Sequence, residues 1–369
     1  MPSARRLKQA DDFDERIRRL RRLMKTDTLD AFLVTHLPNV RYLAGFTGSS
    51  GCLLVQPRRT IFISDNRYRE QAGREVVCDE VHILEGVDLI SHIAAAVKEL
   101  RLKRLGIEGK TLSVWQFFTL EEALERGCRI LPTEDWIESL RQIKGAQELK
   151  LLKKAARIGD RAFRKILSEV RAGISEAQLA RRLRFALEEF GGEKPSFDPI
   201  VLFGGRTSLI HGKPGGARLR RGQLILMDFG TVYRGYCSDM TRTVAFGEPG
   251  EEIRAAYHAV RHAQAETRRA VKAGRKTDQI DAVARRRLEQ MGYGEEFIHA
   301  TGHSLGLEIH EDPRLSEQTS ERLRPGMVVT IEPGVYRAGK YGIRIEDMVH
   351  VTRDGGETLT HTARNLIVL

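Results

Sequence analysis

The stretch LRRGQLILMDFG at residues 219–230 decides the fold, because its pattern returns as LRPGMVVTIEPG at residues 323–334. In both stretches a glycine precedes an apolar run of strand length that ends in an acid, Asp228 in the first and Glu332 in the second. A further acid follows each at a similar interval, Asp239 and then Glu346. The repeated order of strand, acid, turn and acid predicts a domain built from two similar halves.

The helical segments ahead of these strands repeat as well. RAGISEAQLARRLRFALEEFG (171–191) resembles KAGRKTDQIDAVARRRLEQMG (272–292), each with a basic residue, Ala-Gly, a hydroxyl N-cap with an acid behind it, and then a helix. In the first copy, Ser175 and Gln178 predict a capping box. Before this copy, apolar residues recur at spacings of three and four from Leu149 to Val170 and predict one long amphipathic helix.

The amino-terminal third of the chain has a different pattern. A length of 369 residues indicates two domains. Short apolar runs alternate with a helical pattern, which predicts an α/β domain at 1–133 that ends near Pro132 and is followed by a second domain at 134–369. The predicted strands are 30–35, 51–56, 60–65 and 105–109, and the predicted helix is 89–100.

The composition is that of a soluble globular protein, with 41% hydrophobic and 30% charged residues. The chain has no apolar run of about 18 residues, so no membrane span is expected. Its start has basic residues with no apolar stretch behind them, so a secretory signal is not expected. The four cysteines are widely separated and form no CxxC pair, which is typical of buried thiols in a reducing compartment. We therefore expect a cytoplasmic protein.

The net charge of +11 raises the question of nucleic-acid binding. The basic residues are spread through helical segments such as 16–25 and 180–190, where they alternate with apolar positions as on a solvated helix face. No basic loop interleaved with aromatic residues accompanies them. Nucleic acid is therefore not expected as a partner.

The acids at the strand ends indicate a metal site. Carboxylates aimed into one core repel one another unless cations neutralise them. One or two divalent metal ions would do so, and His303, in ATGHSLGLEIHEDP (300–313), would add a nitrogen ligand. Four duplicated acids together with a histidine favour this reading over separate structural roles.

Each of these residues also has a purely structural alternative. Asp228 before Phe-Gly has the position of a turn acid, and Asp239 that of a helix cap or of a partner for Arg242. Glu346 has Arg344 as a nearby ion-pair partner. His303, between glycines, also suits a loop.

Taken together, the motifs resemble those of the pita-bread metallopeptidases that act on Xaa-Pro peptides, aminopeptidase P and prolidase. The resemblance covers nearly the whole chain, and Ser304, where the family usually has glycine, is a modest departure. It implies a creatinase/prolidase-like α/β amino-terminal domain followed by an α+β pita-bread domain with an internal pseudo-twofold repeat. The motifs that carry it are LILMDFG, YCSDMTRT, ATGHSLGLEIHEDP, TIEPGVY and GIRIEDMV, preceded by RYLAGFTGSSG (41–51) and ISDNRYREQA (63–72).

The resemblance also implies a role for individual residues. The implied metal ligands are Asp228, Asp239, His303, Glu332 and Glu346. The implied catalytic residues are His211, His310 and Glu332, and the residues implied in the substrate pocket or behind the ligands are His299, Tyr336 and Arg344. Two divalent ions are implied, Mn(II) first, with Co(II) or Zn(II) as alternatives, because a shell rich in carboxylates and with one histidine suits Mn(II) or Co(II) better than zinc.

The activity implied is removal of an N-terminal residue that precedes proline, with proline-containing peptides as substrates. The alternative is a prolidase restricted to Xaa-Pro dipeptides, and FTGSSG (46–51) favours the aminopeptidase. Methionine aminopeptidases generally lack the α/β domain, while creatinase-type hydrolases and metal-free binding modules of this fold lose ligands that this chain keeps. The family also implies a homodimer formed through residues 1–133. The same domain is expected to close the substrate pocket.

Overall fold

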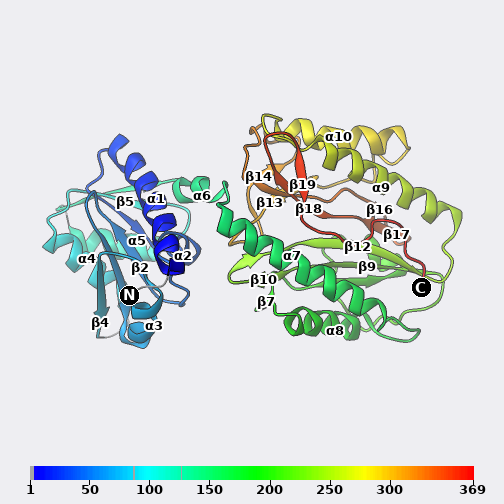
Figure 1. Ribbon diagram of the computed structural model, residues 1–369, viewed down its shortest axis with the longest axis horizontal. Helices are drawn as coiled ribbons and strands as arrows, with labels where there is room; N and C mark the ends of the chain where they lie inside the picture. Colours follow the sequence, from blue (N-terminus) through cyan, green and yellow to red (C-terminus); the bar gives the residue numbers. More distant parts are fainter. Residues whose placement is uncertain (1–3, 86–87, 126) are drawn as a thin grey trace. The chain divides into compact units, whose positions relative to one another are not determined.

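The computed structural model describes residues 4–85, 88–125 and 127–369 and divides into two compact units, Met1–Arg141 and Gln142–Leu369 (Figure 1). The first unit thus ends later than 133, the end predicted for the first domain. Helix α6 (Trp136–Arg141) extends it, because Trp136 stacks on Phe32 with 5.3 Å between ring centroids. Arg141 also donates a hydrogen bond of 2.8 Å to Asn39 in the same unit.

The first unit is an α/β domain, as predicted. Its six strands form one mixed sheet in the order β4-β3-β2-β1-β5-β6, in which β1 pairs antiparallel with β2 and parallel with β5. The strands are β1 (Ala31–Val34), β2 (Cys52–Val55), β3 (Thr60–Asp65), β4 (Glu80–Leu84), β5 (Arg104–Glu108) and β6 (Arg129–Thr133). The helices before α6 are α1 (Ala4–Thr26), α2 (Leu37–Ala44), α3 (Arg69–Glu75), α4 (Leu89–Glu99) and α5 (Val114–Leu124). The four predicted strands and the predicted helix are confirmed.

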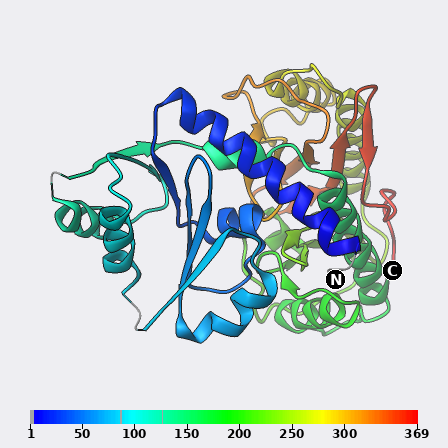
Figure 2. The ribbon, with the colours of Figure 1, turned by 60° about the vertical axis from the view of Figure 1, so that its left-hand side comes forward.

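Strand alternation distributes the helices of this unit over the two faces of its sheet. Ala31 and Leu33 of β1 are buried in one cluster with side chains of α4 and α5, whereas Phe32 between them stacks on Trp136 of α6. Figure 2 shows α4 and α5 together beside the strands. The period of two along β1 therefore sets which side each helix covers.

The second unit contains four long helices and several small antiparallel sheets. Its helices are α7 (Ala146–Leu167), α8 (Glu176–Glu189), α9 (Glu251–Ala270) and α10 (Thr277–Gln290). Its first strands are β7 (Lys194–Pro195), β8 (Ile200–Phe203), β9 (Gln223–Phe229), β10 (Thr231–Tyr233), β11 (Tyr236–Cys237) and β12 (Met240–Phe246). Its later strands are β13 (Gly302–Ser304), β14 (Glu311–Leu315), β15 (Val328–Ile331), β16 (Gly334–Arg337), β17 (Tyr341–Arg344), β18 (Asp347–Val351) and β19 (Gly356–Thr358).

Sheets and helices of the second unit form two similar halves. In the first, α7 and α8 pack on the sheet β12-β9-β8 around Phe163, Leu183 and Met227. In the second, α9 and α10 precede in the chain the strands of the sheet β14-β13-β15-β18-β19. Figure 1 shows β9 and β12 between α8 on one side and α9 on the other.

The turns that lead into α8 and α10 match bond for bond. Gly173 donates to the Leu219 carbonyl at 2.9 Å, and Gly274 donates to the Leu323 carbonyl at 2.8 Å. Both glycines have a positive φ, +80° and +86°, a conformation that favours glycine over other residues. These matching bonds support the predicted internal repeat.

The two helix starts differ in one detail. Ser175 caps α8 in the predicted box with Gln178. The equivalent position before α10 is Lys276, and not the expected hydroxyl residue Thr277, which is the first residue of the helix. Thr277 instead bonds to the loop that follows β14, where its hydroxyl donates to the Thr319 carbonyl at 2.8 Å. A tertiary contact therefore takes the hydroxyl that the sequence pattern assigned to capping.

The structure also describes the cysteines and the apolar character of the helices. The four cysteines are free thiols, three of them buried. Among the residues that the structure describes, no helix combines the length and apolar character needed to cross a bilayer.

Candidate metal centre

The carboxylates of the first half lie on neighbouring strands. Asp228 is near the end of β9, and β12 runs antiparallel to it with Thr241 directly opposite Asp228. Asp239 immediately precedes β12 and is buried. The antiparallel register thus brings the two acids of the first copy to one end of the same strand pair.

His303 lies on β13 and faces these acids. Its Nε2 is 3.5 Å from an Asp239 carboxylate oxygen and 3.6 Å from a Glu332 oxygen. The ladder between β13 and β14 shifts register between His303 and Ser304, and such a bulge re-aims a side chain. A Cβ on Gly302 would lie 2.0 Å from the Thr330 carbonyl oxygen, so β13 can approach β15 this closely only with glycine there.

The tautomer of His303 suits a metal ligand. Its Nδ1 is 3.0 Å from the Ser304 carbonyl oxygen, which can only accept a hydrogen bond. Nδ1 therefore carries a proton toward this carbonyl, and Nε2 is the ring nitrogen that faces the acids. Backbone carbonyls commonly orient metal-binding imidazoles in this way.

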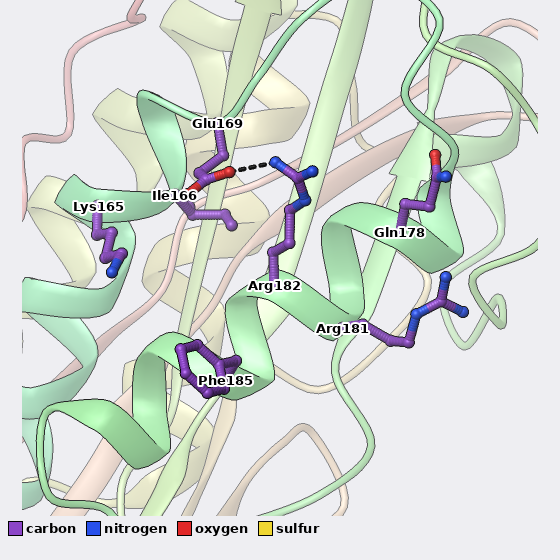
Figure 3. A pocket seen from close by; sticks show the side chains of 7 residues that line it. All are labelled: Lys165, Ile166, Glu169, Gln178, Arg181, Arg182 and Phe185. Atoms are coloured by element: carbon purple, nitrogen blue, oxygen red, sulfur yellow. Dashed lines mark hydrogen bonds and ion pairs between the residues drawn. The ribbon is translucent and has the colours of Figure 1, made fainter.

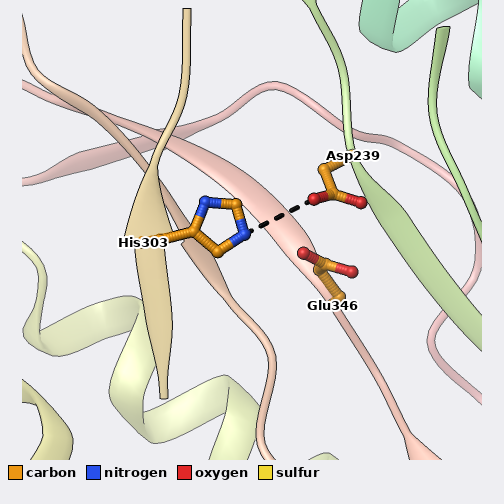
Figure 4. Close-up of side chains that lie close together, drawn as sticks. All are labelled: Asp239, His303 and Glu346. Atoms are coloured by element: carbon orange, nitrogen blue, oxygen red, sulfur yellow. Dashed lines mark ion pairs between the residues drawn. The ribbon is translucent and has the colours of Figure 1, made fainter. Parts of the chain in front are cut away.

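Asp239, His303 and Glu346 form the tightest cluster, with one ligand atom from each within 4.8 Å of the others (Figure 4). Asp228 and Glu332 border it. Three buried carboxylate oxygens here accept no hydrogen bond from the described residues: Asp228 Oδ1, Asp239 Oδ1 and Glu346 Oε1. Buried acceptors without donors are costly, so this donor set fits divalent cations that prefer oxygen ligands.

Burial and mutual repulsion oppose the negative charges. Burial raises the pKa of Asp239 well above its usual range, and the charges of Asp228 and Glu332 add to this rise. The pKa of Glu346 is raised well above its usual range by burial and by the charge of Asp239. Burial also raises the pKa of Glu332. A bound cation would reverse these effects, because it favours the ionised carboxylates.

Arg344 supplies a fixed positive charge behind the acids. Arg344 is 2% exposed, and its guanidinium donates to Asp228 Oδ2 at 2.6 Å, to the Tyr336 hydroxyl at 2.7 Å and to the Thr241 hydroxyl at 3.0 Å. The Thr241 hydroxyl in turn donates to Glu346 Oε2 at 2.8 Å. Arg344 therefore binds Asp228 directly and Glu346 only through Thr241.

The structural alternatives for the acids are not what the structure forms. Arg242 does not pair with Asp239, because its guanidinium is buried and donates to Asp347 at 2.8 Å. Asp228 lies within β9 and not in a turn. Arg344 contacts Asp228 and not Glu346.

Replacing Arg344 by methionine is expected to lower the free energy of unfolding of the metal-free protein by about 3–5 kcal/mol, because a buried carboxylate loses its cation. Divalent ions should reduce this loss of unfolding free energy, because they neutralise the same acids as Arg344. Urea unfolding with chelator and with Mn(II) would measure both effects. Arg353→Met, at an exposed position, is the matched control. A loss in Arg344→Met no larger than in this control would contradict the assigned role.

His299 and Tyr336 continue the chain of hydrogen bonds from Arg344. The Tyr336 hydroxyl lies 3.0 Å from His299 Nε2, and His299 Nδ1 lies 2.8 Å from the Ala300 carbonyl oxygen. Burial and the charge of Arg344 lower the pKa of His299 to about 4, so it is neutral near pH 7. Burial raises the pKa of Tyr336 to about 12. Both groups therefore hold Arg344 in place without carrying charge.

His310 and His211 lie at the exposed side of the cluster. The His310 ring packs edge-on against His303 with 4.6 Å between centroids. Partial desolvation of its ring lowers the pKa of His310, and the neighbouring His303 and Arg314 contribute. His211 contributes to the lowered pKa of both His310 and His299. Both His211 and His310 are exposed and therefore accessible to a ligand.

Sequence reasoning missed two threonines that hold the acids. Besides Thr241, which bonds Glu346, the Thr330 hydroxyl donates to Glu332 at 3.3 Å and accepts from the His303 backbone N–H at 3.1 Å. Strand alternation could have identified both, because Thr241 follows Asp239, and Thr330 precedes Glu332, at a spacing of two.

Ser304, the departure from the family pattern, is fully buried. Its hydroxyl donates to the Val328 carbonyl at 2.9 Å and lies 3.4 Å from Lys144 Nζ. The Lys144 ammonium also pairs with Glu311 at 2.9 Å. The larger side chain thus has polar partners on the side of β13 away from the acids.

A groove of ≈ 410 Å³ lies between α7 and α8 and contains none of the predicted site residues (Figure 3). Arg182 there is paired with Glu169, and Phe185 is exposed. The groove offers no metal ligand cluster, and the candidate centre remains the one around His303.

Two family models match the chain. One, described as metallopeptidase family M24, matches residues 150–353, and the other, described as the creatinase/prolidase N-terminal domain, matches residues 16–143. An uncharacterised peptidase of Bacillus subtilis is 40% identical over 96% of this chain and 100% of its own length. These matches confirm the predicted α/β domain followed by a pita-bread domain.

Solved structures agree over nearly the full chain. An Xaa-Pro dipeptidase from Bacillus anthracis superposes with a TM-score of 0.94 at 41% identity, over 97% of this chain and 100% of that one. An X-Pro aminopeptidase from Thermotoga maritima has a TM-score of 0.88 at 35% identity, over 93% of this chain and 98% of that one. Similar structures thus carry both activity names.

Proposed function

The chain belongs to metallopeptidase family M24, and from this membership we propose that it is an Xaa-Pro aminopeptidase, which releases an N-terminal residue that precedes proline. The observation that carries the proposal is the set of buried, unpartnered carboxylate oxygens on Asp228, Asp239 and Glu346 around His303. A non-catalytic module would have no reason to keep such a costly set.

We assign the metal ions to Asp228, Asp239, His303, Glu332 and Glu346. Members of the family use divalent metals, and two ions in this shell would supply Lewis acidity and a water acidified toward neutrality. Mn(II) suits a shell of four carboxylates and one imidazole, with Co(II) or Zn(II) as alternatives.

The surrounding residues have distinct tasks in this proposal. Glu332 accepts the proton of the attacking water and passes it toward the leaving proline nitrogen, assisted by His211. His310, whose pKa is lowered by partial desolvation, donates an N–H to the developing oxyanion. Arg344, with Tyr336 and His299 behind it, fixes Asp228 and keeps the acids in register.

The second candidate is a prolidase that accepts only Xaa-Pro dipeptides. The name of the Bacillus anthracis relative, an Xaa-Pro dipeptidase, favours it, while the Thermotoga maritima relative, an X-Pro aminopeptidase, favours the aminopeptidase. We propose aminopeptidase activity over prolidase activity because FTGSSG (46–51) resembles the amino-terminal domain of short bacterial Xaa-Pro aminopeptidases. The domain at 1–133 is proposed to close the pocket and to form a homodimer, for which Trp115 and Phe118 on α5 offer exposed apolar side chains.

Release of the N-terminal residue from an Xaa-Pro-Xaa tripeptide tests the proposal. We expect cleavage with Mn(II) and its loss with chelator, because the ions supply the acidified water. An Xaa-Pro dipeptide and an Xaa-Ala-Xaa tripeptide run alongside as controls. Cleavage of the dipeptide alone would make the protein a prolidase. Cleavage of neither proline substrate by metal-loaded protein would refute the substrate class.

A further inference from the structure

Two histidines form a close pair on a helix away from the proposed centre. His258 and His262 lie four residues apart on α9 (Glu251–Ala270) and therefore share one face of the helix. Their ring centroids are 4.1 Å apart, and their Nε2 atoms are 3.0 Å apart. His258 is exposed and His262 is partly exposed, so the pair is open to a ligand from solution.

The separation of the two nitrogens matches that of neighbouring ligands on one metal ion. Metal–imidazole bonds of about 2.0–2.1 Å place two ligands at neighbouring tetrahedral or octahedral positions about 2.9–3.4 Å apart. The measured 3.0 Å falls within this range. A bound ion would therefore need little movement of either ring.

The electronic state of the pair also suits a metal. Burial and the neighbouring His258 lower the pKa of His262, as do the charges of Arg261 and Arg287. A lowered pKa favours the unprotonated ring that a metal needs. In the metal-free protein the short Nε2–Nε2 distance requires one ring to donate N–H to the other. If that ring moves its proton to Nδ1, both Nε2 lone pairs become available, and no proton is released from the protein.

The neighbouring ionisable side chains already have hydrogen-bond partners. Arg261 donates to the side chain of Asn365, and Arg287 is bonded to Glu266 at 2.8 Å. Glu266 is therefore held by the Arg287 cation. Water would fill the remaining coordination positions of an ion bound to His258 and His262.

We propose that His258 and His262 form a second metal site, specific for ions that favour nitrogen ligands: Cu(II) first, then Ni(II) and Zn(II). A pair of imidazoles selects such ions, and the affinity order of divalent metals places Cu(II) highest. The oxygen-rich centre around His303 has instead the carboxylate ligands that suit Mn(II). The two sites would therefore sort different metals, and this inference does not depend on the substrate assigned to the protein.

Copper titration of the full chain, loaded beforehand with Mn(II), tests the site. We expect the visible absorption of nitrogen-bound Cu(II) and retained copper after equilibrium dialysis. His258→Gln and His262→Gln should each weaken copper binding more than about 10–100-fold. That range is the usual loss of metal affinity when a residue that only hydrogen-bonds to a metal ligand is removed. His82→Gln is the matched control, since His82 is an exposed histidine in the first unit.

Two outcomes separate a metal site from a simple hydrogen bond between rings. Copper retained by wild type and by His82→Gln but lost from both pair variants supports the site. Equal copper binding by wild type and the His258→Gln/His262→Gln double variant would overturn it, and the ring contact would then be only an N–H···N hydrogen bond. Peptidase activity with Mn(II) should be unchanged in the pair variants.

Discussion

Replacing Asp239 by asparagine is expected to abolish hydrolysis of Xaa-Pro substrates together with divalent-metal binding, while the chain stays folded. Asp239 is buried, one of its oxygens has no partner among the described residues, and it belongs to the tightest ligand cluster. Its removal takes a charge from the centre of the ligand set. Metal content after dialysis and turnover of the tripeptide would measure both losses.

The same variant should respond to metals differently from wild type in thermal unfolding. Mn(II) at 100 times its dissociation constant should stabilise wild type by about 2.7 kcal/mol, because it binds only the folded chain. Asp239→Asn should lose this gain. Without metal it should be more stable than wild type, because burial and the charges of Asp228 and Glu332 already disfavour the Asp239 carboxylate.

Asp354→Asn removes an exposed carboxylate and is the matched control for this experiment. It should keep the metal, the activity and the metal-dependent stabilisation of wild type. An Asp239→Asn protein that still hydrolyses the tripeptide at the wild-type rate would refute the proposed centre.

Replacing His310 by alanine is expected to lower kcat by about 10²–10³-fold, the usual cost of removing one oxyanion donor. The loss should appear in kcat more than in KM, because the oxyanion develops only in the transition state. Bound metal should be unchanged, since His303 and the carboxylates provide the ligands. Steady-state kinetics and metal analysis of the same preparation would show the separation.

His361→Ala removes another exposed histidine of the second unit and serves as the control for His310→Ala. It should retain wild-type kinetics. If His310→Ala kept its kcat, His310 would have no part in the reaction, and loss of metal from the variant would place it among the ligands instead.

Much of the site was predictable because it depends on local pattern. A buried strand that ends in an acid places a carboxylate at the edge of a core, and two copies of that pattern make chance a poor explanation. The acids Asp228 and Glu332 and the histidine His303 could be selected from such patterns. Strand alternation would also have added Thr241 and Thr330.

The partners of the charged groups could not be predicted in the same way. Arg344 and Glu346 are close in sequence, yet Arg344 reaches Asp228 on β9, and Glu346 accepts from Thr241 on β12. Arg242 is close to Asp239 but donates to Asp347. Proximity along the chain is a poor guide here, because Arg344 ends β17 whereas Glu346 lies beyond that strand, and Asp239 precedes β12 whereas Arg242 lies within it. Each side chain therefore meets whichever strand packs beside its own part of the chain.

Tertiary contacts also decide where the first unit ends and where α10 begins. The stacking of Trp136 on Phe32 assigns α6 to the first unit, and a bond to the Thr319 carbonyl removes Thr277 from the capping position. In both cases a contact between segments distant in sequence overrides a local signal.

The sequence by itself determined four strands and one helix of the first unit, the internal repeat, and the order and chemical type of the candidate ligands. These follow from side-chain period, glycine positions and residue identity, which are local properties. Only the tertiary structure decided that Asp239, His303 and Glu346 converge, that Arg344 compensates Asp228, and that three carboxylate oxygens are buried without donors. Those facts depend on strand register and on packing between the two halves, and no short stretch of the chain contains that information.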